Sequence, residues 1–350
     1  YKTLKSDNFE SVQKNIIISR ICYDLGYYFR TKRDFERSLL YYQRALGLLR
    51  HHWELKSQQA TVESNLSFVL ALIGEFDVAL DWAHDANSLH MERGVFSILG
   101  NSYNVLGNIK LLSGSFSEAL QDGYRAQSLI RYPWGEQSAT EDTILKRYIG
   151  FNSVLLSECL RRVASMDEIR PPILNKEIQL TDNIIDREDF LILAIKYAEE
   201  SVKAFEAVDD NDYKIQAYME KGCSNRDYYK FFVDNSKTFG ELEYYRSASD
   251  SLKQAINLAN KTDNFYRELD AKINLAWLNY YKLLALRNQN ISFGTKEIDI
   301  KFLSELIHEI DIITSNKELP SLDIKKNSLP HSINQFANKD IHGLLGKIYM

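Results

Sequence analysis

The sequence predicts an all-α fold, an α-solenoid in which antiparallel helix pairs stack one after another. Residues 25–48 alternate apolar and small side chains at helical spacing around a short polar turn, which indicates two helices packed together. The pattern then recurs, because the first small residue of each second helix falls at Ser38, Ala79 and Ala119, 41 and then 40 residues apart. With only 5 Pro and 15 Gly in 350 residues, the chain can sustain long helices.

Packing positions define the first helix pair. Leu25-Gly26 is followed by an aromatic residue three positions after the glycine, and the second helix places a small residue on either side of Tyr42. Small residues let two helices approach closely, while bulky residues fill the space between them. The bulky positions are Leu25, Phe29, Phe35 and Tyr42, and the small positions are Ser38 and Ala45.

This order of Leu-Gly, aromatic, small, aromatic and small residues resembles the tetratricopeptide repeat (TPR). The resemblance implies a superhelix whose concave side is lined by the first helix of each pair. The standard unit has about 34 residues, and the longer period here is similar to that of arrays in large signalling ATPases, peptide-sensing regulators and kinesin light chains. We expect the extra residues to add about one helical turn and to lengthen the loops between repeats, at 51–58 and 90–98.

Two further regular pairs follow the first. Each carries a leucine anchor in its first helix, Leu66 and then Leu106, and each turn holds a glycine two residues before a phenylalanine. Glycine at such a turn supplies backbone conformations that other residues adopt with strain. The small packing residues are Ala79, Ala83 and Ala86 in the second pair and Ala119, Gly123 and Ala126 in the third.

The pattern becomes irregular after residue 130. We expect the fourth pair at 144–163 and 189–208, separated by an acidic insertion at 164–188. Gly222 falls in the middle of the first helix of the fifth pair, where glycine disfavours a helix. A loop composition, with Pro320 and clustered Ser, Asp and Lys, follows the sixth pair at 315–328. The fifth and sixth pairs are expected at 212–232 with 241–260 and at 264–286 with 296–314.

The predicted organisation has three parts: regular repeats 1–3 in residues 1–130, irregular repeats 4–6 with insertions in 131–330, and the start of a truncated repeat in 331–350. Leu345-Gly346 and Tyr349 have the spacing of the first repeat, without a second helix after them. The chain also starts without Met. We therefore expect a piece of a longer protein, with flanking domains outside it.

Composition argues against several classes of function. A net charge of −5 and the lack of a basic run interleaved with aromatic residues argue against nucleic acid as a partner. No apolar run approaches the roughly 20 residues of a membrane-spanning helix, and no leader-like segment is apparent, so we expect a cytoplasmic protein without membrane contact. Cys22, Cys159 and Cys223 lie far apart in helical patterns, which indicates buried thiols and not disulfides.

Patterns that carry catalysis or metal binding are weak. No glycine loop followed by Lys-Ser/Thr is present, and no two His flank a Glu at the spacing of zinc ligands. His51-His52 falls at an expected helix end, where His is an ordinary residue. Glu199-Glu200 and Asp209-Asp210 fit solvated helix faces and ends. We expect no enzyme activity, no cofactor and no metal site in these residues.

The TPR resemblance places a partner surface on the first helix of each pair. A row of Asn side chains there can bind the backbone of an extended peptide, because each amide has a donor and an acceptor. Chaperone-docking members of the family hold a terminal carboxylate with Lys, Arg and Asn, and Tyr23, Tyr27 and Val105 stand at such places here, which argues against chaperone docking. The expected partner-binding residues are Tyr23, Asp24, Tyr27, Asn65, Phe68, Asn101, Asn104 and Asn108.

We therefore expect a protein- or peptide-binding scaffold or sensor arm of a larger intracellular regulatory protein, with its partner on the concave face. Three alternatives stay open: the repeats regulate a fused enzyme such as a signalling ATPase or a caspase-like protease, an active site forms in the irregular half at 144–314, or the array is a spacer between domains. The insertion at 164–188 and the loop around Trp134 are further candidate contact sites.

Overall fold

The structure, a computed structural model, describes residues 2–50, 52–94, 96–131, 139–166, 186–235 and 241–288, together with 301, 304, 305 and 308. In α1 side chains are described from residue 13 onward. Throughout these ranges the regular structure is helical, which confirms the predicted all-α class. The chain divides into two compact units, Tyr1–Leu155 (unit 1) and Leu156–Met350 (unit 2), and each is described by itself.

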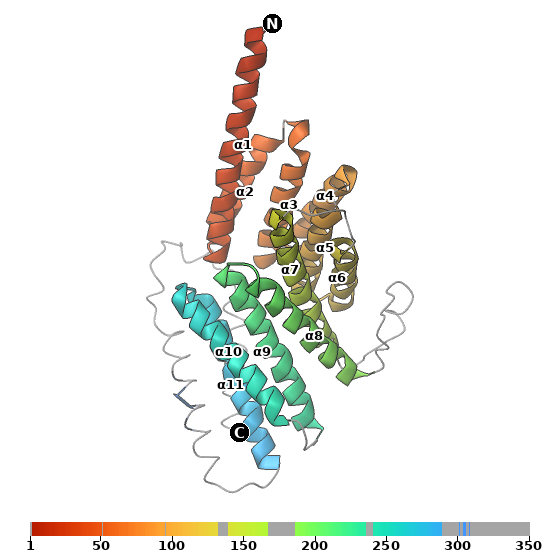
Figure 1. Cartoon of the computed structure of the whole chain (residues 1–350), viewed down its shortest axis with the longest axis vertical. Coiled ribbons are helices and arrows are strands. Elements are labelled where there is room, and N and C mark those ends of the chain that lie inside the picture. Colours follow the sequence, from red (N-terminus) through yellow and green to blue (C-terminus); the bar gives the residue numbers. More distant parts are fainter. Residues whose placement is uncertain are drawn as a thin grey trace. The chain divides into compact units, whose positions relative to one another are not determined.

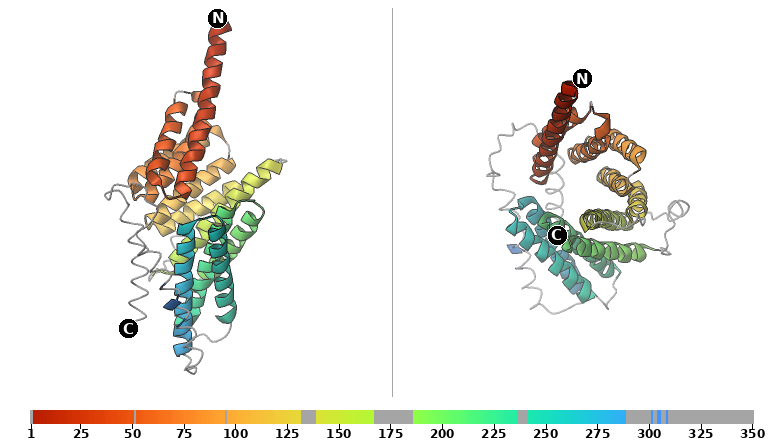
Figure 2. Two further views of the ribbon diagram at one scale, coloured as in Figure 1. Left: turned by 90° about the vertical axis from the view of Figure 1, so that its left-hand side faces the viewer. Right: turned by 45° about the horizontal axis from the view of Figure 1, so that its top comes forward.

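Unit 1 is a row of helix pairs. The first, third and fifth helices each pack on the helix that follows, and each of these three pairs packs on its neighbour (Figures 1 and 2). This stacking confirms the predicted solenoid architecture. The elements are α1 (Lys2–Thr31), α2 (Phe35–Leu49), η1 (Trp53–Leu55), α3 (Lys56–Leu72), α4 (Phe76–Arg93), α5 (Phe96–Leu112), α6 (Phe116–Arg131) and the first part of α7 (Ala139–Ala164), up to Leu155.

The Leu-Gly signature has a direct packing reason in the first pair. A Cβ atom at Gly26 would lie 2.8 Å from the ring of Tyr42, so only glycine lets this buried tyrosine pack against α1. The hydroxyl of Ser38 donates a hydrogen bond to the Gly26 carbonyl oxygen at 2.8 Å. Ser38, Tyr42 and Ala45 are all buried, as the spacing predicts.

The turns within the three pairs each contain a residue with a positive φ angle at the same position. Gly74 and Gly114 have φ angles of 92° and 88°, in the region where residues with a Cβ atom are strained. Arg33 takes the corresponding place in the first turn, with a φ angle of 56°. Asp34 then caps α2 by accepting a hydrogen bond from the backbone N–H of Arg37 at 3.1 Å.

One helix of unit 1 is longer than its apolar pattern, and one expected loop is wrong. α1 begins at Lys2, although its continuous apolar run starts only at Ile16. The residues at 90–98 do not form a long loop, because α4 continues to Arg93 and α5 begins at Phe96. Gly94, with a φ angle of 68°, ends α4 in a left-handed cap. The long period here lengthens a helix and not a loop.

Unit 2 comprises the end of α7 from Leu156, α8 (Arg187–Glu206), α9 (Asn211–Asp234), α10 (Glu241–Lys261) and α11 (Phe265–Asn288). These helices match the expected ones to within a few residues, apart from an earlier start of α7. Asp186 and Asp210 begin α8 and α9 as N-caps, with a full capping box at Asp186. The predicted small positions of α8 and α10, Ala194, Ala198, Ser201, Ala248 and Ala255, are fully buried.

Gly222 does not interrupt α9. A Cβ atom at this position would lie 2.6 Å from Leu252 Cγ, so the glycine lets α10 approach α9 closely. The helix contains Gly222 because packing requires it there.

Several expectations lie outside the described residues: the Trp134 side chain, most of the insertion at 164–188, most of the helix at 296–314, the loop at 315–328 and the truncated repeat at 331–350. The three-part division of the chain stays a prediction. Within the described ranges, no helix has both the length and the apolarity needed to cross a bilayer.

Candidate partner-binding site

Five side chains from α1 and α3 form a connected group, the Arg30 cluster: Tyr23, Tyr27, Arg30, Asn65 and Phe68. Helical spacing sets Tyr23, Tyr27 and Arg30 on one side of α1, at steps of four and three residues. Asn65 and Phe68, three residues apart on α3, face them across the junction of the first two pairs. The packing of α3 beside α1 therefore assembles a site that neither helix holds alone.

Arg30 is the central residue of the cluster. Its guanidinium carbon lies 4.9 Å from the ring centroid of Tyr27 and 5.3 Å from that of Phe68, so two aromatic rings flank the cation. Its Nη1 atom donates a hydrogen bond to Asn65 Oδ1 at 3.0 Å. No carboxylate of the described residues forms an ion pair with Arg30. Within the described part of the chain, the cluster thus presents an oriented cation without a counter-charge.

Asn65 holds the cluster together. Its Nδ2 atom donates to the Tyr23 hydroxyl at 3.2 Å and to the Thr61 carbonyl oxygen at 3.0 Å, while its Oδ1 atom accepts from Arg30. Both ends of the amide are engaged within the chain. Asn65 therefore positions Arg30, and it is not free to bind a peptide backbone as the Asn pattern suggests.

The structure thus brings together four of the expected partner-binding residues: Tyr23, Tyr27, Asn65 and Phe68. Asp24, also expected, points away into solvent and pairs with Arg20 at 3.3 Å. Arg30 was not among the expected residues, although its place three residues after Tyr27 and seven after Tyr23 is a usable signal. Its importance depends on α3, which lies 35 residues further along the chain.

The asparagines of α5 do not form a continuous accessible row. Asn104 is 4% exposed, and its Oδ1 atom is buried without a hydrogen-bond partner among the described residues. Asn108 donates through Nδ2 to the Asn104 carbonyl oxygen at 2.8 Å. Asn101 is half-buried. A partner could reach Asn101 and Asn108 directly, whereas Asn104 contributes mainly to packing, and a role for these three residues stays a prediction.

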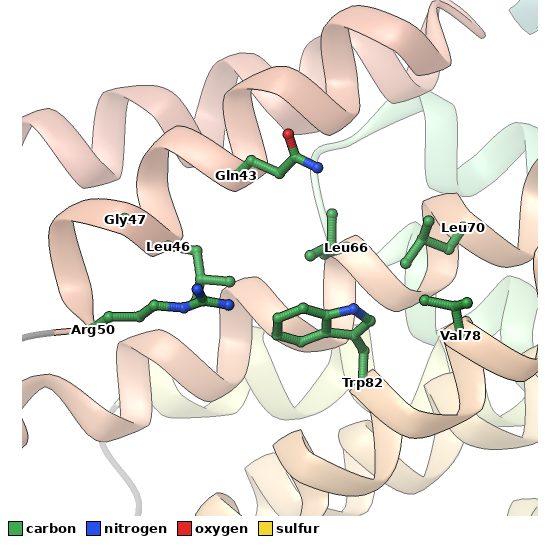
Figure 3. A pocket seen from close by; sticks show the side chains of 8 residues that line it. All are labelled: Gln43, Leu46, Gly47, Arg50, Leu66, Leu70, Val78 and Trp82. Atoms are coloured by element: carbon green, nitrogen blue, oxygen red, sulfur yellow. The ribbon is translucent and has the colours of Figure 1, made fainter.

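A second surface lies between α2, α3 and α4 (Figure 3). This pocket, the Trp82 groove, has a volume of about 370 Å³. Figure 3 shows the Trp82 indole and the Arg50 side chain extending toward each other, and the guanidinium carbon of Arg50 lies 5.5 Å from the indole centroid. The lining residues are Gln43, Leu46, Gly47, Arg50, Leu66, Leu70, Val78 and Trp82.

Unit 2 contains a buried ionic network between α7 and α9. The Arg161 guanidinium donates to Glu220 through Nε at 2.8 Å and Nη2 at 2.9 Å, and to Asp227 through Nη1 at 2.7 Å. Ser157 Oγ lies 2.8 Å from Glu220 Oε1 and 2.8 Å from the carbonyl oxygen of Ala194 in α8. The network therefore links three helices.

The pKa values in this network follow from burial and pairing. Burial raises the pKa of Glu220 despite its ion pair with Arg161. Burial would also raise the pKa of Asp227, but Arg226 and Arg161 outweigh it and lower this pKa to about 2. All four carboxylate oxygens accept hydrogen bonds from within the network. These hydrogen bonds brace the helices against one another.

The remaining reactive side chains are also buried. All three cysteines are free and buried, as predicted, and burial raises the pKa of each thiol, to about 11 for Cys223. A thiolate nucleophile is therefore disfavoured at these positions. Burial lowers the pKa of His90 to about 4, which keeps its ring neutral near pH 7. The described residues contain no group of three or more His, Cys, Asp and Glu side chains that could hold a metal ion.

No protein-family model matches this chain, and no curated protein shows significant similarity to it. Among solved structures, the chain is similar to the TPR2AB domain of yeast Sti1 in its complex with pHSP90. The two share 15% identity over 85% of this chain and 97% of that chain, with a TM-score of 0.28. The all-α solenoid fold rests on the stacked helix pairs themselves.

Proposed function

We propose that this chain is a protein- or peptide-binding scaffold whose partner docks on the face formed by α1, α3 and α5, with an acidic group placed at Arg30. The observation that carries this proposal is the Arg30 cluster, in which two aromatic rings and Asn65 orient a cation that has no carboxylate partner among the described residues. Such a cation binds a carboxylate through charge-assisted hydrogen bonds without first having to be ordered.

The wider setting follows from the resemblance to long-period TPR arrays. In this proposal the chain is the sensing or scaffold arm of a larger cytoplasmic regulatory protein, its partner is held on the concave face, and flanking domains provide the output. Regulation of a fused signalling ATPase or caspase-like protease is one form of the same role. An active site in the irregular half has less support, because the charged groups that meet there, in the network around Arg161, already pair with one another.

Arg30→Gln tests the proposal. We expect the affinity for the partner to fall about 10- to 100-fold, because one charge-assisted contact worth about 1.5–3 kcal/mol is lost. The wild-type chain is first incubated with a native lysate, and the proteins that it captures are identified by quantitative mass spectrometry. The affinity of each is then measured by titration against the wild-type chain and the variant.

Arg44→Gln is the matched control. Arg44 also lies over an aromatic ring, with its guanidinium carbon 5.6 Å from the centroid of Tyr41, but it belongs to α2. Partner binding should not change in this variant. Equal losses in both variants, or no loss in Arg30→Gln, would contradict a partner site at the Arg30 cluster.

A further inference from the structure

The Trp82 groove is apolar although the fold does not require it to be. The equivalent positions one repeat later, on α5 and α6, carry charged side chains. These side chains form ion pairs, since Lys110 Nζ lies 2.8 Å from Asp122 Oδ2 and 3.3 Å from Glu118 Oε2. At a spacing of 40 residues, the counterparts of Leu70, Val78 and Trp82 are Lys110, Glu118 and Asp122.

The two repeats differ at these three positions. Helix pairs of the same type pack with apolar residues there in one repeat and with ion-paired residues in the next, so either set is compatible with stacking. Val78 is nevertheless 44% exposed, and it stands where the next repeat has an exposed glutamate. Apolar area kept at the surface without a packing reason indicates an interaction site.

Gly47, which lines the groove, is a second indication of an interaction site that does not depend on the comparison between repeats. At Gly26, Gly100, Gly107 and Gly222 a Cβ atom would lie 2.6–2.8 Å from a neighbouring side chain, which explains those glycines. A Cβ atom at Gly47 would meet nothing within 4 Å. Glycine inside a helix costs about 1 kcal/mol relative to alanine. No contact in the described part of the chain offsets that cost. A partner helix packed closely against α2 would require a residue without a side chain at this position.

The two rims of the groove carry opposite charges. On α2, Arg50 is exposed and borders the groove. On α4, Asp77, Asp81 and Asp85 recur every four residues, are all exposed and alternate along the helix with the groove residues Val78 and Trp82. A bound helix would therefore meet a basic rim on one edge and an acidic rim on the other.

We propose that the Trp82 groove binds an amphipathic helix of a protein partner. The apolar ridge of that helix packs on Leu66, Leu70 and Trp82, its acidic edge faces α2, and its basic edge faces α4. The groove is separate from the Arg30 cluster, because Leu66 lies about 100° around α3 from Asn65. The chain would thus hold a second partner, or a second segment of one partner, on its even-numbered helices.

A defined peptide tests this proposal on the full chain. The probe is a fluorescein-labelled helix of about 18 residues with a leucine ridge, Glu along one edge and Lys along the other. Its binding is followed by fluorescence anisotropy. We expect micromolar affinity for the wild-type chain and at least a tenfold loss in Gly47→Gln, whose side chain would enter the groove. The melting temperature of Gly47→Gln should not fall, since the new side chain points into open space and favours the helix.

Two further variants sharpen the test. Ser88→Gln, at the exposed equivalent position of α4, should leave the affinity unchanged, as should Arg30→Gln, so this proposal and the proposed function can fail separately. The triple variant Leu70→Lys, Val78→Glu, Trp82→Asp copies the ion-paired residues of the next repeat and should fold but lose binding.

Three results would overturn the proposal: no binding to the wild-type chain, equal binding to Gly47→Gln, or equal binding of a scrambled peptide of the same composition. Self-association of the wild-type chain that Gly47→Gln abolishes would assign the groove to a second copy and would also overturn a partner helix.

Discussion

Arg161→Met is expected to destabilise unit 2 by about 3–5 kcal/mol, because it leaves a buried carboxylate without its partner. The guanidinium donates two hydrogen bonds to Glu220 and one to Asp227, and the side chains of Arg161 and Glu220 are both buried. Methionine fills much of the volume of Arg161 but offers no donor. The loss should be read by hydrogen exchange of the amides in α8 and α9, since a chain of two units need not unfold in one step.

The same helix offers a matched control for this result. Arg162 is exposed, and its Nη2 atom lies 3.2 Å from Glu158 Oε1, one turn earlier on α7. Arg162→Met should change stability by no more than about 0.5 kcal/mol, because exposed ion pairs contribute little. The double variant Arg161→Met, Glu220→Leu should recover part of the loss, since it removes both members of the pair. An Arg161→Met variant as stable as Arg162→Met would contradict the bracing role of the network.

Gly222→Leu is expected to destabilise unit 2 by about 3 kcal/mol through overpacking. The new Cβ atom would lie 2.6 Å from Leu252 Cγ, 2.7 Å from Leu252 Cδ2 and 3.4 Å from the carbonyl oxygen of Ala248. Leu252 and Ala248 are fully buried, so neither can move into free space. α9 and α10 would have to separate, and hydrogen exchange should accelerate in both helices.

Gly47→Ala is the matched control for the glycine substitution. Both glycines lie inside helices, but a Cβ atom at Gly47 meets nothing within 4 Å. Alanine should therefore stabilise unit 1 by up to about 1 kcal/mol through its higher helix propensity. Opposite signs at the two glycines are the expected result, and stabilisation by Gly222→Leu would refute the close contact with α10.

The sequence pattern predicted most of the helices because helix formation is encoded locally. Apolar and small residues recur at helical spacing, and Gly74 and Gly114 mark two of the turns. The first residues of α1 are not visible in this pattern, since they are mostly polar and carry no apolar period. The loop expected at 90–98 was wrong, because α4 continues to Arg93 and no helix-ending residue precedes Gly94.

The candidate site was predictable in part. The TPR resemblance pointed to the first helix of each pair, and four of the expected side chains do surround Arg30. Arg30 itself was missed because an arginine near a helix end fits any solvated surface. The engagement of Asn65 and the burial of Asn104 could not be foreseen, since both depend on what the neighbouring helix places opposite them.

Local periodicity, which depends only on neighbours three or four residues away, was sufficient to establish the helix pairs, their small packing residues and the repeating architecture. Which side chains meet depends on contacts between residues far apart in the chain. Arg161 and Glu220 are 59 residues apart, with α8 between them, and only the packing of α9 against α7 joins them. Likewise, only the stacking of α2, α3 and α4 shows that Gly47 and Trp82 border one open groove.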